Sequence, residues 1–233
     1  MGCHCSQTKE FEQEEETLIV HFEQCLGFGN HTAGHICTQV QVLTLNERLN
    51  WNRLRQLTSV LNLNVEGLQS SEEPIARLYE GLKEGKEWKA RQISLLGVLL
   101  GQGKAAVKAP LLFRLYDPDD SGVLSTPRIE EMLQDLCAIA FTHLPLFAQR
   151  MLGNSDSAVL LGSYIDHLAE AKQATCLFLA RQIAEGPVSA QDFVIKAQEC
   201  AKSMFSAKLL RTEGLRHYKN CLRSLQRLRA STI

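Results

Sequence analysis

Apolar residues recur at intervals of three or four along most of the chain, which is the spacing of an amphipathic helix. The pattern first becomes clear at Leu18, Ile19, Phe22 and Leu26. It predicts a helix over residues 10–26, whose first turns hold five glutamates, after a short polar leader over 1–9. The segment 27–34 contains three glycines and is expected to end this helix.

Similar spacing predicts helices along the rest of the chain. They are expected near 49–61, 75–82, 93–100, 105–116, 127–136, 145–183 and 190–210, followed by a basic helix at the C-terminus. The segment 145–183 is expected to divide into two helices near 153–155. Leucine is common and hairpin turn pairs such as Asn-Gly are absent, so helices are favoured over strands. The predicted fold class is all-α.

The composition is that of an ordinary globular protein. Of the 233 residues, 45% are hydrophobic and 22% are charged, and the net charge is −1. This balance provides no basic field, so no nucleic-acid partner is expected. The longest strongly apolar stretch, 93–100, is far shorter than the roughly 18 residues of a membrane span. Eight irregularly spaced cysteines, without an apolar signal region before them, favour reduced thiols in the cytosol.

One segment has the pattern of a calcium-binding loop. Its candidate calcium ligands are Asp117, Asp119, Ser121, Val123 and Ser125, at loop positions 1, 3, 5, 7 and 9. Gly122 stands at position 6, where such a loop turns sharply. Together with the preceding Leu-Phe-Arg-Leu-Tyr at 112–116, the segment resembles the EF-hand family, in particular calcineurin-B-like and neuronal calcium-sensor proteins. The resemblance implies paired EF-hand-like helix–loop–helix units, with Leu124 at position 8 pairing with its counterpart in the partner loop.

The loop departs from the EF-hand pattern at position 12. The family has a bidentate glutamate there, whereas this chain has Arg128, which removes two oxygens and adds a positive charge. Glu130 and Glu131 lie too late in the sequence to substitute without rebuilding the start of the helix. The departure favours a turn and helix cap, and weak calcium binding is the alternative. No other cofactor is expected.

Short internal matches support repeated helix–loop–helix units. Residues 124–129 (Leu-Ser-Thr-Pro-Arg-Ile) match 188–193 (Val-Ser-Ala-Gln-Asp-Phe) in residue type, and 88–93 is a looser third copy. Segments near 77–82 and 185–190 also resemble the EF-hand-like N-terminal region of TLDc-domain, mTOR-associated lysosomal proteins. That resemblance implies no TLDc activity, because the chain is expected to end where such a domain would begin.

These observations predict four parts. A lipidated leader over 1–9 is expected to precede two EF-hand-like halves, 10–104 and 105–207. The last part, 208–233, is expected to be a basic amphipathic helix, because 208–229 holds seven Lys or Arg against one acid. Apolar residues recur in it at Leu215, Tyr218, Leu222 and Leu225. The helix is expected to pack on its own domain, and contact with an acidic membrane or a partner is the alternative.

The N-terminus has the pattern of a lipidation signal. Gly2 follows the initiator methionine and Ser6 stands in the favoured place for N-myristoylation. Cys3 and Cys5 lie where palmitate is added in dually acylated proteins. This start resembles that of Src-family kinases of the Met-Gly-Cys type. The resemblance implies a lipid anchor on Gly2, Cys3 and Cys5.

Other chemistry-bearing groups give weaker signals. A cluster of soft metal ligands comprises His21, Cys25, His31, His35 and Cys37. Zinc needs four converging ligands, and the glycines at 29 and 34 argue against a helix that would bring two histidines together. Residues 101–104 (Gly-Gln-Gly-Lys) lack the first glycine and the Ser/Thr of a phosphate-binding loop. Asp166 and His167 stand without a nucleophile signature, so no enzymatic activity is expected.

The sequence therefore predicts a membrane-tethered, non-catalytic adaptor or regulatory subunit of EF-hand-like fold. EF-hand pairs hold an amphipathic helix or peptide in an apolar groove, so a protein partner of that kind is expected. The expected location is the cytoplasmic face of the plasma membrane or an endolysosomal membrane, reached through the N-terminal lipid. The alternative is a calcium-responsive sensor that exposes its groove when calcium binds.

Overall fold

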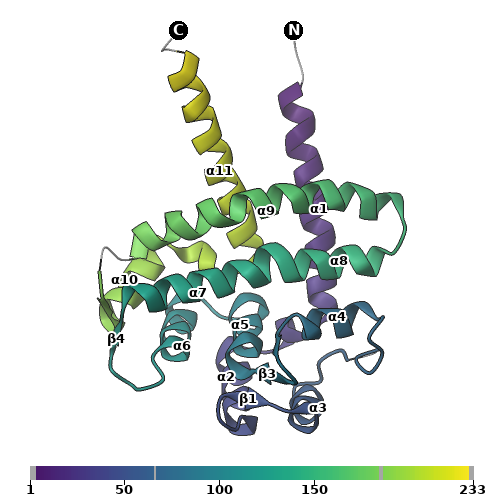
Figure 1. The fold of residues 1–233 in the computed structure, drawn as a ribbon, viewed down its shortest axis with the longest axis vertical. Helices are drawn as coiled ribbons and strands as arrows, with labels where there is room; N and C mark the ends of the chain where they lie inside the picture. The colour runs from purple at the N-terminus through teal and green to yellow at the C-terminus, as the bar shows by residue number, and fades with distance from the viewer. Residues whose placement is uncertain (1–3, 66, 184–185, 231–233) are drawn as a thin grey trace.

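The computed structural model describes residues 4–65, 67–183 and 186–230, and the described chain is predominantly α-helical (Figure 1). The N-terminal elements are α1 (His4–Cys25), η1 (Phe28–Asn30), α2 (Ala33–Leu43), β1 (Arg48–Leu49), α3 (Trp51–Val60), α4 (Pro74–Glu80), β2 (Lys83–Glu84), β3 (Glu87–Lys89) and α5 (Ala90–Leu100). The C-terminal elements are α6 (Ala105–Tyr116), β4 (Val123–Leu124), α7 (Thr126–Ala138), η2 (Ile139–His143), α8 (Leu144–Leu152), α9 (Asp156–Ile183), β5 (Val188–Ser189), α10 (Ala190–Glu199), η3 (Lys202–Phe205) and α11 (Ala207–Ala230). The prediction of a mostly helical protein is confirmed.

Short strands join the helices in two sets. In the N-terminal half, β1 pairs antiparallel with β3, which places Leu49 opposite Trp88, and β2 forms the other edge of the sheet. In the C-terminal half, β4 pairs antiparallel with β5, which places Leu124 opposite Val188. The segments that match one another in sequence therefore each form a short strand that leads into a helix: β3 into α5, β4 into α7, and β5 into α10.

One hydrophobic core runs through both halves. The four facing strand residues, Leu49, Trp88, Leu124 and Val188, are all buried in it. In the C-terminal half, α7, the π-helical turn η2 and α8 form a long rod, and α9 runs alongside it (Figure 1). Burial of apolar side chains from helices of both halves explains why the chain folds around a single core.

The described structure has a helix in two places where the sequence analysis expected none. Helix α1 begins at His4, so the predicted polar leader is largely helical. Helix α2 was not predicted, because the three glycines of 27–34 were taken to break the chain. Thr32 caps α2 by accepting a hydrogen bond from the His35 N–H, and Ile36 and Val40 are buried, which outweighs the cost of one glycine in its first turn.

Two other predicted segments differ in detail. Leu49 lies in β1, and α3 begins only at Trp51, where the Asn50 side chain caps it. The predicted helix over 190–210 is interrupted: α10 ends at Glu199, and η3 carries Met204 and Phe205 into the core before α11 starts. Burial of these two side chains requires the chain to leave the helical path.

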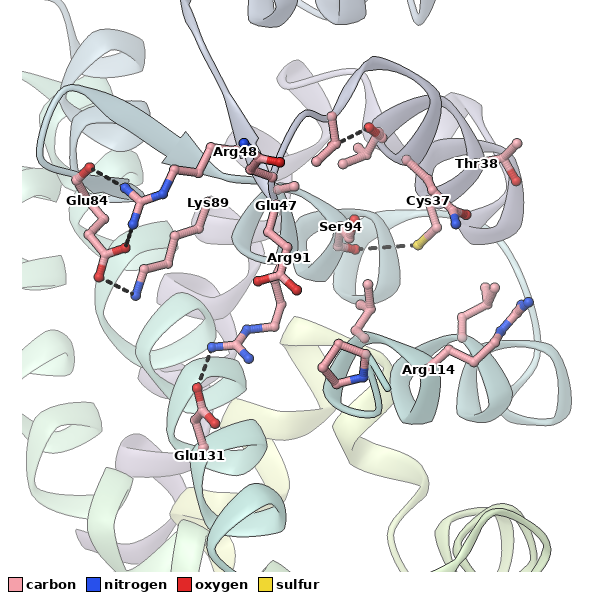
Figure 2. Close-up of a pocket in the computed structure, with 18 of the residues that line it drawn as sticks. Cys37, Thr38, Glu47, Arg48, Glu84, Lys89, Arg91, Ser94, Arg114 and Glu131 are labelled. Atoms are coloured by element: carbon pink, nitrogen blue, oxygen red, sulfur yellow. Dashed lines mark hydrogen bonds and ion pairs between the residues drawn. The ribbon is translucent and has the colours of Figure 1, made fainter. Parts of the chain in front are cut away.

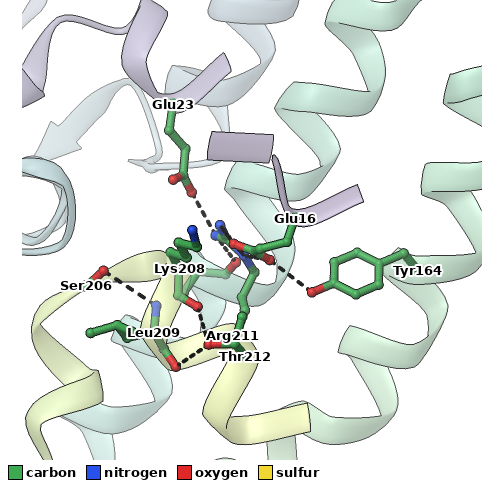
Figure 3. A network of polar contacts seen from close by, with 9 residues as sticks. Glu16, Glu23, Tyr164, Ser206, Lys208, Leu209, Arg211 and Thr212 are labelled. Atoms are coloured by element: carbon green, nitrogen blue, oxygen red, sulfur yellow. Dashed lines mark hydrogen bonds and ion pairs between the residues drawn. The ribbon is translucent and has the colours of Figure 1, made fainter. Parts of the chain in front are cut away.

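A buried ion network attaches α1 to α11 (Figure 3). Arg211 is fully buried and donates to Glu16 Oε1 at 2.6 Å and to Glu23 Oε1 at 2.7 Å. It also donates to the carbonyl oxygen of Ala140 at 3.1 Å, and the Tyr164 hydroxyl donates to Glu16 Oε2 at 2.9 Å. Burial raises the pKa of Glu23, although Arg211 opposes this. The network therefore holds α1, α9 and α11 together with polar contacts inside the core.

The described ends of α1 and α11 project from the same side of the body (Figure 1). Of the helices in the described ranges, none combines the length and the hydropathy that crossing a bilayer requires.

Candidate functional site

A groove with a volume of about 720 Å³ lies between the two halves (Figure 2). One wall comes from α2, β1, β2, β3 and α5, and the other comes from α6, Pro118 and α7. Its charged lining residues are Glu47, Arg48, Glu84, Lys89, Arg91, Arg114, Arg128 and Glu131. Five cations therefore face three carboxylates, which makes the groove electropositive in a chain whose net charge is −1.

The carboxylates Glu84 and Glu131 are each shared by two cations. Figure 2 shows Glu84 between Arg48, at 2.7 Å, and Lys89, at 3.1 Å. Hydrogen bonding from Lys89 and the charge of Arg48 lower the pKa of Glu84. Glu131 on the opposite wall is likewise paired with two cations. Both carboxylates are therefore kept ionised, and the neighbouring cations neutralise their charge.

Glu131 pairs with Arg128 at 2.9 Å and also accepts a hydrogen bond from Arg91. Partial burial acts to raise the pKa of Glu131, but the hydrogen bonds from Arg128 and Arg91 lower it overall. Arg114 forms no ion pair with any described side chain. Its guanidinium is therefore the cation of the groove that is most available to an external anion.

Arg91 fixes the two walls relative to each other. Its guanidinium lies 4.5 Å from the centre of the Tyr116 ring, and its Nε lies 3.6 Å from Asp135 Oδ2. The Tyr116 hydroxyl donates to the same carboxylate oxygen at 2.6 Å. These contacts join α5 to α6 and α7, so the groove is preorganised before any ligand binds.

The remaining lining is neutral. Leu111 and Leu115 supply apolar surface from α6, and Cys37 belongs to the lining from α2. Burial raises the pKa of Cys37 to about 11, and its thiol points at the Ser94 carbonyl oxygen 3.9 Å away. A neutral thiol is a weak nucleophile, and Cys37 lies beside the Ser94 carbonyl oxygen of α5.

The predicted calcium loop borders the groove through Pro118 and Arg128. Both carboxylate oxygens of Asp117 accept hydrogen bonds from the loop itself: from Ser121 N–H at 2.9 Å, Ser121 Oγ at 2.6 Å and Gly122 N–H at 2.9 Å. The Ser121 hydroxyl bond and the backbone bonds lower the pKa of Asp117. Gly122 has a φ of 72°, which suits the turn expected at position 6.

The other predicted calcium ligands are Asp119, Ser121, Val123 and Ser125, and their contacts differ from those of Asp117. The carbonyl oxygen of Val123 lies 3.0 Å from Ser121 Oγ, and Ser125 directly precedes α7 without capping it through its side chain. Asp119 forms no hydrogen bond that reaches beyond this loop among the described residues. The turn and helix cap stays the prediction for this loop, and weak calcium binding stays its alternative.

Nowhere in the described ranges do three or more His, Cys, Asp or Glu side chains converge on a possible metal position. Of the weaker zinc candidates, His31 contacts the Leu61 carbonyl oxygen at 2.5 Å and its ring lies 5.7 Å from that of His35.

The predicted lipidation residues cannot be placed in the same way. Gly2 and Cys3 lie outside the described residues, as does the side chain of Cys5, whose backbone belongs to α1. The lipid anchor stays a prediction.

Sequence reasoning did not find the charged groove. Arg48 and Lys89 stand opposite each other in the β1–β3 pair, although 41 positions separate them in the chain. Charged residues beside short apolar segments were the only local signal of the groove, and many surface segments share that signal.

In comparisons with known proteins, no family model, no curated protein and no solved structure matches this chain.

Proposed function

We propose that the protein is a membrane-tethered, non-catalytic adaptor of EF-hand-like fold whose groove binds an acidic segment of a partner protein. The observation that carries this proposal is the electropositive groove between the halves, with five cations, three carboxylates and an unpaired Arg114.

The strand pairing supports the EF-hand-like part of the proposal. In an EF-hand pair, the residue at loop position 8 pairs with its counterpart in the other loop, and Leu124 stands at that position. It lies opposite Val188 in the antiparallel pair β4–β5. Leu49 and Trp88 have the same relation in the other half. Two pairs of helix–loop–helix units would then enclose the groove.

The charge of the groove selects the chemistry of the partner. Glu84 and Glu131 are already neutralised by their cations, so an approaching carboxylate meets an excess of positive charge. A volume of about 720 Å³ holds several side chains, which is the size of one face of a peptide and not of a whole helix. Leu111 and Leu115 provide apolar contacts for the same segment. An acidic amphipathic segment meets all three conditions.

The calcium-sensor alternative has less support. Asp117 already accepts three hydrogen bonds from its own loop, so a calcium ion would have to displace them. Arg128 occupies position 12 and pairs with Glu131 in the groove. The same residue therefore serves the groove better than it serves a metal site.

Affinity purification from cells tests the groove. Arg114→Glu reverses the charge of the unpaired cation without breaking an ion pair, and Lys202→Glu makes the same change at an exposed position outside the groove. Proteins captured by the wild type should be lost with Arg114→Glu, and retained with Lys202→Glu and Arg114→Lys. Equal capture by Arg114→Glu and wild type, with unchanged thermal stability, would show that the groove does not bind the partner.

Cell fractionation tests the tether. Myristate alone binds membranes only marginally, so a second signal such as palmitate is needed. Gly2→Ala should release the protein to the soluble fraction, and Cys3→Ser with Cys5→Ser should weaken attachment nearly as much. If Gly2→Ala stays membrane-bound, the N-terminal lipid is not the anchor.

A further inference from the structure

The C-terminal end of α11 is a surface that the rest of the described protein leaves uncovered. Every side chain over 220–227 is exposed, whereas Leu215 is buried against the body. Leu222 is 41% exposed and Leu225 is 54% exposed, although both belong to the apolar stripe of the helix. The stripe therefore continues past the point at which its protein contacts end.

The apolar and basic side chains of this end lie on separate faces. At 100° per residue, each of two sets of four residues spans an arc of about 80°. The apolar set is Leu215, Tyr218, Leu222 and Leu225. The basic set is Arg216, Lys219, Arg223 and Arg227. No acidic residue occurs over 214–227, so the helix end has a strongly positive face beside an apolar one.

We propose that this end of α11 binds the surface of an anionic membrane. Leu222 and Leu225 enter the boundary between headgroups and acyl chains, and Arg223 and Arg227 contact the anionic headgroups. A second copy of the same helix fits less well, because the basic faces would repel each other beside the apolar seam. The proposal does not depend on lipidation, but it uses the same side of the molecule, since α1 and α11 project together (Figure 1).

Vesicle sedimentation with the full, unlipidated chain tests the proposal. The vesicles contain phosphatidylcholine alone, or phosphatidylcholine with phosphatidylserine. The protein should sediment with the anionic vesicles and not with the neutral ones, and added salt should reduce binding because it screens the charges. Arg223→Gln with Arg227→Gln should weaken binding about 25-fold, since each cation near such a surface contributes about fivefold.

Two further variants separate the proposal from simpler explanations. Leu222→Ser with Leu225→Ser should also weaken binding, because the apolar contacts are lost. Lys86→Gln with Lys104→Gln removes two exposed charges elsewhere and should leave binding unchanged. Circular dichroism of each variant checks that the fold is retained.

Three results would overturn the proposal. The first is equal binding to neutral and anionic vesicles, and the second is unchanged binding by both α11 variants. The third is a wild type that does not bind vesicles but forms a dimer in sedimentation velocity, with the leucine variant remaining monomeric. Arg114→Glu should bind vesicles like the wild type, so failure here is distinguishable from failure of the proposed groove. Because the protein carries no lipid in this experiment, its result does not depend on the proposed N-terminal anchor, which cell fractionation tests.

Discussion

Removal of the buried Arg211 side chain should destabilise the protein strongly. The Arg211 guanidinium is completely inaccessible to solvent and donates to Glu16, to Glu23 and to the Ala140 carbonyl oxygen. Arg211→Ala leaves two buried carboxylates without the cation that they share. Both carboxylates are buried, so each is left desolvated without its counter-charge.

The expected loss follows from the burial of the partners. The side chains of Glu16 and Glu23 are only 3% and 8% exposed. Removing one partner of a buried ion pair costs about 3–5 kcal/mol, whereas an exposed pair is worth about 0–1 kcal/mol. For a domain of this size, each kcal/mol lowers Tm by about 2–4 °C. Arg211→Ala should therefore lower Tm by about 6–20 °C.

Urea unfolding followed by circular dichroism at pH 7 measures the free energy of unfolding. Arg216→Ala, an exposed arginine on the same helix, is the matched control and should change it by less than about 0.5 kcal/mol. Glu16→Gln should cost more than Glu23→Gln, because Glu16 also accepts from Tyr164 and burial already raises the pKa of Glu23. A loss below about 1 kcal/mol for Arg211→Ala would refute the reasoning, since that is the value of an exposed pair.

Three other predictions concern single side chains. Burial lowers the pKa of Lys108 from 10.5 to about 8, so folding expels a proton between these values and stability should fall as the pH decreases from 10.5 through 8. Lys108→Met should remove that part of the pH dependence in thermal melts, and identical pH profiles would contradict the assignment. Gly97→Ala should cost about 1–3 kcal/mol, because its Cβ would lie 2.6 Å from Ile36 Cγ2, whereas Gly186→Ala meets no atom within 4 Å and should be nearly neutral. Isothermal titration should detect no micromolar calcium binding by the wild type, and Arg128→Glu should improve binding by restoring two ligand oxygens; tight wild-type binding would show the prediction to be wrong.

Helices with local start and stop signals could be predicted from the sequence. Helix α6 has the predicted bounds, 105–116, and α7 begins with Pro127 in its first turn as its sequence indicated. Helix α2 was missed because its start depends on the Thr32 cap and on the approach of Ile36 to Gly97 in α5. That approach is a contact between distant segments, which the spacing of apolar residues does not reveal.

The groove could not be predicted, because its charges become neighbours only through strand pairing and through the packing of α5 against α7. Glu84 forms ion pairs with Arg48 from one strand and with Lys89 from another.

Arg211 shows a different limit of sequence-based prediction. The sequence placed it with the basic residues of the C-terminal helix, yet it lies four residues before Leu215 and seven before Tyr218, on the apolar stripe. The spacing of Arg211 from these apolar residues indicated a buried position. Because arginine is charged, the sequence analysis counted it with the exposed basic residues instead.

The two proposed surfaces lie at opposite ends of the molecule. The described ends of α1 and α11 project at one end of the long axis, and of the groove walls α2 and β1 lie at the other end, with α6 and α7 nearer the middle (Figure 1). A membrane bound at the first end therefore lies away from the elements that line the groove. Because distant sites act independently, Arg114→Glu combined with Arg223→Gln and Arg227→Gln should lose partner binding and vesicle binding by the same factors as the separate variants. A combined loss of vesicle binding greater than that of the α11 variant alone would show that the groove itself contacts the membrane.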